Sequence, residues 1–179
     1  MKKIQMVDLK SQYNFIKKEV ADNMLQVFES SNFINGPMVK AFQADMESYL
    51  NVKHVIPCAN GTDALQIALM VFKLDPGDEV ITSDFTFAAT VEVISLLKLK
   101  PVLVDVDPQT FNIDPKAVEK AITSKTKAII PVHLYGHPCN MDSLKKICDK
   151  NNLIIIEDCA QALGAEYRGR KVGSFGKAA

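Results

Sequence analysis

Two groups of polar residues follow short apolar segments that lie far apart in the sequence. Asp158 ends the most apolar run of the chain, and Gln161 follows three residues later. A carboxylate at the end of a buried strand loses hydration, so it normally has a cationic partner. Earlier in the chain, residues 55–58 lead into Gly61 and Thr62 at the start of a helical pattern. A turn of this kind can offer free backbone N–H groups to a phosphate.

A ligand that carries both a phosphate and a protonated ring nitrogen would satisfy both groups, and pyridoxal phosphate (PLP) is such a ligand. Phe87 follows a third apolar segment and would offer an aromatic face to the ring. Simpler interpretations are a turn and helix cap at Gly61 and Thr62, a core position for Phe87, and a capping box at Asp158 and Gln161. Ligands of parallel sheets collect beyond the carboxyl ends of the strands, so three such junctions favour a shared site.

Composition limits the class of protein. A chain of 179 residues, 47% of them hydrophobic and with zero net charge, suits one globular domain. The charge balance gives no footprint for nucleic acid or for an anionic membrane surface, and no apolar run is long enough to span a bilayer. With no signal-peptide core near the start, we expect a cytoplasmic protein. Without a C-x-x-C pair, we expect free thiols at Cys58, Cys139, Cys148 and Cys159.

Two helices are predicted before residue 55. Residues 11–30 have helical apolar spacing, and a second helix is expected from Pro37, which suits a first helical position. The first helix is expected to bury one stripe, formed by Tyr13, Ile16, Val20, Met24 and Val27.

Short apolar segments then alternate with amphipathic ones. Because the apolar segments are continuous, they predict strands buried on both faces, in a three-layer α/β/α fold with a mostly parallel sheet. The expected strands are residues 55–58, 80–82, 102–106, 128–132 and 153–156. The expected helices between them are residues 63–72, 88–97, 115–122 and 142–151. A hairpin is expected around Gly169.

Other chemistries find less support. His133 and His137 have a spacing that suits metal ligands on a helix, but the glycine and proline beside His137 disfavour a helix, so no metal site is expected. Asp105 and Asp107 resemble a phosphatase carboxylate pair, but a turn before Pro108 explains them. The glycine-rich motif of dinucleotide-binding folds and the P-loop lysine are both missing.

Seven segments in order resemble the DegT/DnrJ/EryC1/StrS aminotransferase family, and the resemblance extends over nearly the whole chain. They are residues 60–65 (NGTDAL), 76–81 (PGDEVI), 85–90 (FTFAAT), 104–107 (VDVD), 130–136 (IPVHLYG), 157–161 (EDCAQ) and 172–176 (VGSFG). The resemblance implies the fold type I of PLP enzymes. Residues 1–179 would hold the N-terminal helices and part of the PLP-binding large domain, with the rest of that domain and a small C-terminal domain outside the chain.

The resemblance also implies roles for residues. Gly61 and Thr62 match the phosphate-binding turn, and Phe87 matches the aromatic position that stacks on the pyridine ring. Asp158 matches the acid that pairs with the ring nitrogen, and Gln161 matches the amide near the phenolic oxygen. Asp158 would keep the nitrogen protonated, so that the ring accepts electrons as a carbanion forms.

The catalytic amine is expected outside the chain. The family's Schiff-base lysine lies beyond Ala179, and Lys177 falls where relatives commonly carry an acid, so we interpret Lys177 as a surface or strand-edge residue and not as the catalytic amine. This chain would then hold no catalytic residue and would be inactive alone. Cys159 replaces the more usual alanine, which puts little in doubt.

The resemblance implies PLP-dependent transamination of a nucleotide-linked keto sugar with glutamate as amino donor, for amino-sugar or surface-polysaccharide synthesis. A UDP-linked 3-oxo-glucuronate (UDP-2-acetamido-2-deoxy-3-oxo-glucuronate) is one candidate substrate. Family members are usually homodimers, and residues 33–37 resemble a loop near the interface, although an ordinary turn explains them equally well. A non-catalytic relative without the lysine, or another fold type I enzyme such as a desulfurase or a sugar dehydratase, stays open.

Overall fold

The computed structural model describes residues 6–179, which divide into two compact units that meet in sequence between Met46 and Glu47. The first unit contains α1 (Leu9–Ser30) and the beginning of α2 (Pro37–Leu50). Asp8 caps α1, since its side chain accepts a hydrogen bond from the backbone N–H of Ser11. Both helices were predicted, and both are confirmed.

The buried stripe predicted for α1 is wrong. No residue of α1 is buried, and the side chains of Tyr13 and Met24 are each about half exposed. A helical stripe is buried only when a second apolar surface packs against it. The described part of the first unit does not provide that surface.

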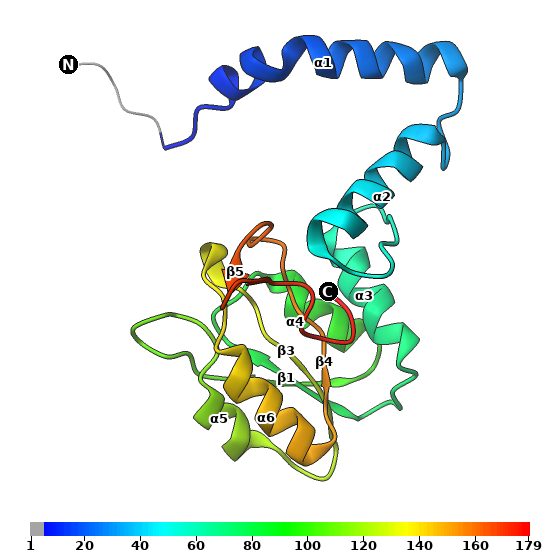
Figure 1. The fold of residues 1–179 in the computed structure, drawn as a ribbon. Helices are drawn as coiled ribbons and strands as arrows, with labels where there is room; N and C mark the ends of the chain where they lie inside the picture. The colour runs from blue at the N-terminus through cyan, green and yellow to red at the C-terminus, as the bar shows by residue number, and fades with distance from the viewer. Residues whose placement is uncertain (1–5) are drawn as a thin grey trace, which may run out of the picture. The chain divides into compact units, whose positions relative to one another are not determined.

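The second unit contains a four-stranded parallel sheet with strand order β2-β1-β3-β4. Figure 1 labels β1, β3 and β4 of this sheet. Its strands are β1 (Glu79–Ser83), β2 (Lys100–Val104), β3 (Thr126–Ile130) and β4 (Ile154–Ile155). Its helices are α3 (Gly61–Val71), α4 (Ala88–Leu96), α5 (Pro115–Ala121) and α6 (Met141–Asn151). After β1 the chain leaves toward β2 on one side and then returns to β3 on the other, so the strand order reverses beside β1. Ligands of such sheets bind where the order reverses, beyond the carboxyl ends of the strands.

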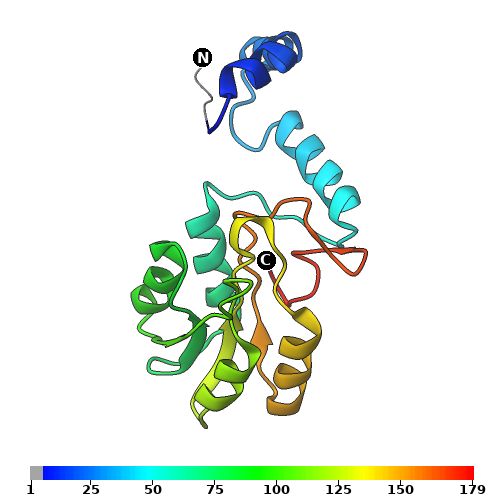
Figure 2. The ribbon, with the colours of Figure 1, turned by 90° about the vertical axis from the view of Figure 1, so that its left-hand side faces the viewer.

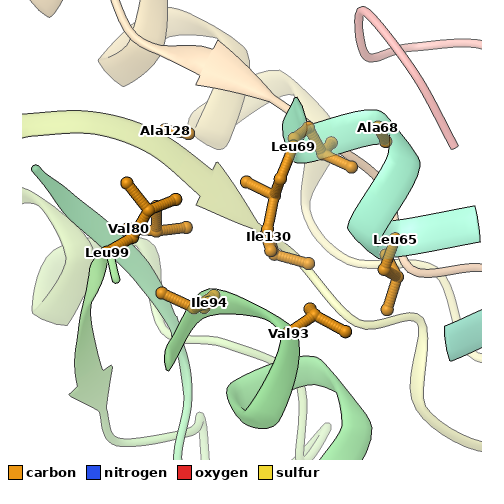
Figure 3. Packing of buried hydrophobic residues seen from close by; sticks show 10 residues of the cluster. Leu65, Ala68, Leu69, Val80, Val93, Ile94, Leu99, Ala128 and Ile130 are labelled. Atoms are coloured by element: carbon orange, nitrogen blue, oxygen red, sulfur yellow. The ribbon is translucent and has the colours of Figure 1, made fainter. Parts of the chain in front are cut away.

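Successive strand residues pack on opposite faces of the sheet. Val80 and Ile130 join α3 and α4 in one core cluster (Figure 3), whereas Ile81 and Ile129 join α5 and α6 in the other. Figure 2 shows α3 and α4 on one side of the sheet and α6 on the other. The predicted three-layer α/β/α arrangement is therefore confirmed.

The predicted strand at residues 55–58 does not form. The backbone N–H of Val55 donates to the carboxylate of Glu47 at 3.0 Å instead of to a neighbouring strand, and Pro57 has no N–H to donate. The segment enters α3 as an irregular connection.

The fourth strand is shorter than predicted, but its pairing continues through isolated bridges. Pro131 removes a donor at the end of β3, and only single bridges join Val132 to Asp158 and Ile156 to Ala178, both parallel. The second bridge places the chain around Ala178 beside β4, running in the same direction.

Three further expectations can be compared with the structure. β5 (Glu166–Tyr167) and β6 (Arg170–Lys171) form the predicted hairpin, whose turn residues Arg168 and Gly169 both have positive φ. The four cysteines are free thiols. Among the described helices, none combines the length and the apolar character needed to cross a bilayer.

Candidate active site

Asp158 is held by its backbone at the carboxyl edge of the sheet. Its N–H donates to the carbonyl of Pro131 at 2.9 Å, and its carbonyl accepts from the N–H of His133 at 3.1 Å. The residue is 7% exposed. These contacts fix the carboxylate at one position beyond β3 and β4.

Two hydrogen-bond donors contact the Asp158 side chain. Its Oδ2 accepts from the Thr90 hydroxyl at 2.8 Å, and its Oδ1 accepts from the N–H of Ala160 at 3.2 Å. Among the described residues it forms no salt bridge. A buried carboxylate in this state suits a ligand that brings a positive charge.

Gly61 and Thr62 open α3 behind a side-chain cap. The Asn60 side chain accepts from the N–H of Asp63 at 2.9 Å and so satisfies one of the four free donors at the helix start. Within residues 6–179, the N–H groups of Gly61 and Thr62 have no acceptor. Gly61 is exposed, so the two donors form an accessible anion site at the positive end of the helix dipole.

The turn and the carboxylate are close neighbours. A Cβ built on Gly61 would lie 3.9 Å from the Cβ of Ala160, whose N–H donates to Asp158. Ala160 therefore lies beside the Gly61 turn and also bonds to the carboxylate. A ligand with a phosphate at one end and a protonated nitrogen at the other has the charges that suit these two groups.

Phe87 lies at the start of α4 as its N-cap residue. Its side chain is 70% exposed, so the interpretation as a core residue is wrong. Its carbonyl accepts from the N–H of Thr90 at 3.1 Å, and the Thr90 hydroxyl binds Asp158. An accessible aromatic ring thus lies one helical turn from a residue that touches the carboxylate.

Gln161 contacts the loop that follows β3. Its Oε1 accepts from the N–H of Tyr135 at 2.8 Å, and Tyr135 itself has a positive φ of 51°. Asp158 forms an isolated β-bridge and a turn follows at residues 160–161, so no helix begins here and the capping-box interpretation of Asp158 and Gln161 is wrong. The structure places Gln161 three residues beyond Asp158 with its side chain tied to the neighbouring loop.

Sequence reasoning missed two residues at this edge. One is Thr90, which lies one turn after Phe87 in a predicted helix, and that spacing could have indicated that both face the same rim. The other is Glu157, which is fully buried next to Asp158. An acid inside an apolar run was the available signal, because such a group needs several donors.

Glu157 ties the segment before Ala179 to the sheet. Its Oε1 accepts from the N–H groups of Phe175 at 2.6 Å and Gly176 at 2.7 Å. Its Oε2 accepts from the N–H of Gly173 at 2.9 Å and lies 3.1 Å from His133 Nε2. Burial raises the pKa of this carboxyl, but the hydrogen bonds from His133 and the backbone outweigh burial and hold the pKa below its ordinary value.

The tautomer of His133 follows from its partners. The N–H of Cys139 donates to Nδ1 at 3.0 Å, so the ring proton is on Nε2 and points at Glu157. Ligand atoms of His133, Glu157 and Cys159 lie within 4.8 Å of one another. Both nitrogens of the His133 ring and both oxygens of the Glu157 carboxylate are already hydrogen-bonded. The pKa of the Cys159 thiol is raised, mainly by burial and further by the negative charges of Glu157 and Asp158. We assign this cluster to hydrogen bonding and not to metal binding.

The sequence profile of the DegT/DnrJ/EryC1/StrS aminotransferase family matches residues 14–179. The chain belongs to this family. It is 51% identical over 176 residues to a pleiotropic regulatory protein of Geobacillus stearothermophilus, covering 98% of this chain and 47% of that protein. It is 45% identical to the UDP-2-acetamido-2-deoxy-3-oxo-D-glucuronate aminotransferase of Pseudomonas aeruginosa, covering 94% of this chain and 47% of the enzyme. The chain therefore spans about half the length of these relatives.

Solved structures agree with the fold. DesV of Streptomyces venezuelae superposes with a TM-score of 0.94 at 39% identity, over 97% of this chain and 47% of DesV. NtdA of Bacillus subtilis, solved with bound PMP, superposes with a TM-score of 0.89 at 34% identity, over 97% of this chain and 40% of NtdA. The predicted fold, an α/β domain of the fold type I aminotransferases, is confirmed.

Aminotransferases of this family use PLP. The groups that the described residues offer fit that cofactor: two N–H groups without an acceptor for a phosphate, an exposed phenyl ring, and a buried carboxylate that no described cation contacts. When bound, PLP supplies an electron sink for the carbon that loses a proton.

Proposed function

We propose that the intact protein is a PLP-dependent aminotransferase that transfers the amino group of glutamate to a nucleotide-linked keto sugar. The observation that carries the proposal is the buried Asp158 carboxylate, which has two hydrogen-bond donors and, among the described residues, no cation. Ala160, whose N–H donates to Asp158, lies beside the free donors of the Gly61 turn. Relatives that bear sugar-aminotransferase names support the substrate class.

In this proposal each site residue has one task. The N–H groups of Gly61 and Thr62 and the Thr62 hydroxyl bind the phosphate, and Phe87 stacks on the pyridine ring. Asp158 holds the proton on the ring nitrogen, and Gln161 hydrogen-bonds near the phenolic oxygen. These roles follow from the matching motif positions, and the contacts described above are compatible with them.

The amine that binds the cofactor would come from a lysine beyond Ala179. The chain around Ala178 runs parallel to β4, so a segment continuing in that direction would reach the edge where Asp158 lies. Residues 1–179 would then be the N-terminal helices and part of the large domain. The chain alone would be inactive, because it lacks that lysine.

The identity of the sugar substrate is a more specific part of the proposal. A UDP-linked 3-oxo-glucuronate is favoured by the 45% identical enzyme of that specificity. The 51% identical relative is named a regulatory protein, which favours a second candidate, a family member that binds ligand without transamination. A lysine after the serine-phenylalanine-glycine segment would support the enzyme, and its replacement would support the second candidate.

We further propose a homodimer, in which residues 33–37 approach the interface. A cytoplasmic location, expected from the sequence, stays a prediction.

The test uses the full-length protein with PLP and glutamate. We expect the cofactor absorbance to change when glutamate is added, and keto-sugar addition to restore it with an amino sugar detectable by mass. Asp158→Asn should slow both half-reactions while leaving the fold intact. Asp75→Asn, an exposed site in the loop before β1, is the matched control and should behave as the wild type. Equal half-reaction rates in Asp158→Asn and Asp75→Asn would overturn the role of Asp158.

A further inference from the structure

We propose that Thr90 is a positioning residue for Asp158, fixing the orientation and the anionic form of its carboxylate through a hydroxyl relay that begins at Thr86. The inference rests on the proposed function, because it concerns how Asp158 holds the proton of the cofactor's ring nitrogen.

The direction of the relay follows from the chemistry of its members. An ionised carboxylate can only accept, so the Thr90 hydroxyl must donate its one proton to Oδ2 of Asp158, at 2.8 Å. Thr86 Oγ1 lies 2.9 Å from Thr90 Oγ1. With the Thr90 proton committed, the Thr86 hydroxyl is the donor in that contact. The order is therefore Thr86 to Thr90 to Asp158.

Both ends of the Thr90 to Asp158 bond are rigid. Thr90 is fully buried in the first turn of α4, and the same helix places Val93 and Ile94, also fully buried, in the core under the sheet. Asp158 is pinned by backbone hydrogen bonds to the chain after β3. The hydrogen bond thus joins the Asp158 carboxylate to α4, and backbone hydrogen bonds join the same residue to the chain after β3.

The hydroxyl of Thr90 does not serve its own helix. A threonine inside a helix commonly donates to the carbonyl one turn earlier. Thr90 instead donates to a residue 68 positions away in the sequence. Valine would fill the same volume, so packing alone does not account for a hydroxyl here.

A hydrogen bond to the charged form of a carboxylate favours that form. When Asp158 shares a proton with a ring nitrogen, the Thr90 bond therefore favours the state with the proton on nitrogen. The other donor, the N–H of Ala160, is longer at 3.2 Å and cannot fully replace it. Without the Thr90 hydroxyl, the proton on the ring nitrogen should shift toward the Asp158 carboxylate. The pyridine ring would then accept electrons less well.

The experiment compares four full-length proteins loaded with PLP: wild type, Thr90→Val, Thr90→Ser and Thr82→Val. Thr82 is the matched control, since it is equally buried but its hydroxyl donates to the Ile130 carbonyl, away from Asp158. The readouts are the ¹⁵N chemical shift of ring-labelled PLP and the rate of the half-reaction with glutamate at full cofactor occupancy.

We expect Thr90→Val to move the ¹⁵N signal toward unprotonated pyridine and to slow the half-reaction ten- to a hundredfold, about the range of one hydrogen bond to a charged group. Thr90→Ser should restore both to about twofold of wild type, and Thr82→Val should change neither. If Thr90→Val does not fold, Thr86→Val, which removes only the outer donor, should shift the ¹⁵N signal in the same direction by a smaller amount.

A wild-type ¹⁵N signal and rate in Thr90→Val would overturn the proposal, and so would a failure of Thr90→Ser to restore them. If Thr90→Val does not fold, an unchanged ¹⁵N signal in Thr86→Val would overturn the proposal as well. If the wild type binds no PLP, or does not react with glutamate, the proposed function fails and this inference fails with it. If the wild type reacts and only the Thr90 variants disagree, the inference alone is wrong.

Discussion

Replacing Glu157 by glutamine tests how strongly the segment before Ala179 depends on one buried carboxylate. The side chain accepts two hydrogen bonds at each oxygen: from Phe175 and Gly176 at Oε1, and from Gly173 and His133 at Oε2. A glutamine has one carbonyl oxygen and one NH₂ group, so in either orientation two donors would face another donor. Hydrogen bonds to charged groups are worth about 1.5–3 kcal/mol each, so losing two should cost about 3–6 kcal/mol.

The effect should also depend on pH. The pKa of the Glu157 carboxyl is lower in the folded state than its ordinary value of 4.5. A group with a lowered folded-state pKa stabilises the folded state above its unfolded-state pKa, and this contribution is lost as the pH falls through the folded-state pKa. The stability difference between wild type and Glu157→Gln should therefore be full near neutral pH and shrink in acid below about pH 4.5.

The assay is urea unfolding of the full-length protein together with amide hydrogen exchange of residues 173–176. Exchange in that segment should accelerate roughly a hundredfold or more, since each 1.4 kcal/mol is a factor of ten. Glu119→Gln is the matched control, because Glu119 is half exposed and pairs with Lys150 on the surface, where such pairs contribute about 0–1 kcal/mol. If Glu157→Gln and Glu119→Gln agreed within 1 kcal/mol, our account of the buried carboxylate would be refuted.

Three other experiments give independent tests. Thr62→Ala should weaken PLP binding only modestly, because the backbone donors remain, and unchanged affinity in a PLP titration would argue against a role for the hydroxyl. Phe87→Ala should leave the melting temperature nearly unchanged, since the ring is 70% exposed, while PLP affinity falls; a large loss of stability would instead indicate a core role. In thiol labelling mapped by mass spectrometry, exposed Cys58 should react well before Cys139, whose pKa burial and the Glu157 charge raise to about 12; the reverse order would contradict the described burial.

Much of the fold could be predicted because its signals are local. Val80 and Ile81 are adjacent apolar residues, a pattern typical of a strand covered on both faces, and the structure buries every residue of β1. Apolar residues alone did not predict the structure of residues 55–58 correctly. The N–H of Val55 bonds to the Glu47 side chain, and Pro57 has no N–H to donate to a neighbouring strand. The stripe of α1 shows another limit, since periodicity identifies the apolar face of a helix but not the surface that would cover it.

Some residues of the candidate site could also be predicted from local sequence patterns, and others could not. Gly61 and Asp158 could be proposed from the sequence because a glycine turn and an acid that follow short apolar segments form recognisable short motifs. Thr90 and Glu157 were missed because their roles depend on tertiary contacts: Thr90 bonds to Asp158, and Glu157 collects donors from Gly173 onward. No local pattern specifies which distant backbone groups will converge on a buried carboxylate.

A structure of the full-length protein with PLP bound tests the central claim most directly. We predict the ring nitrogen within about 3 Å of the Asp158 carboxylate, with phosphate oxygens accepting from the N–H groups of Gly61 and Thr62 at a similar distance. A cofactor whose phosphate lies away from the start of α3, or whose ring nitrogen faces another group, would contradict the account.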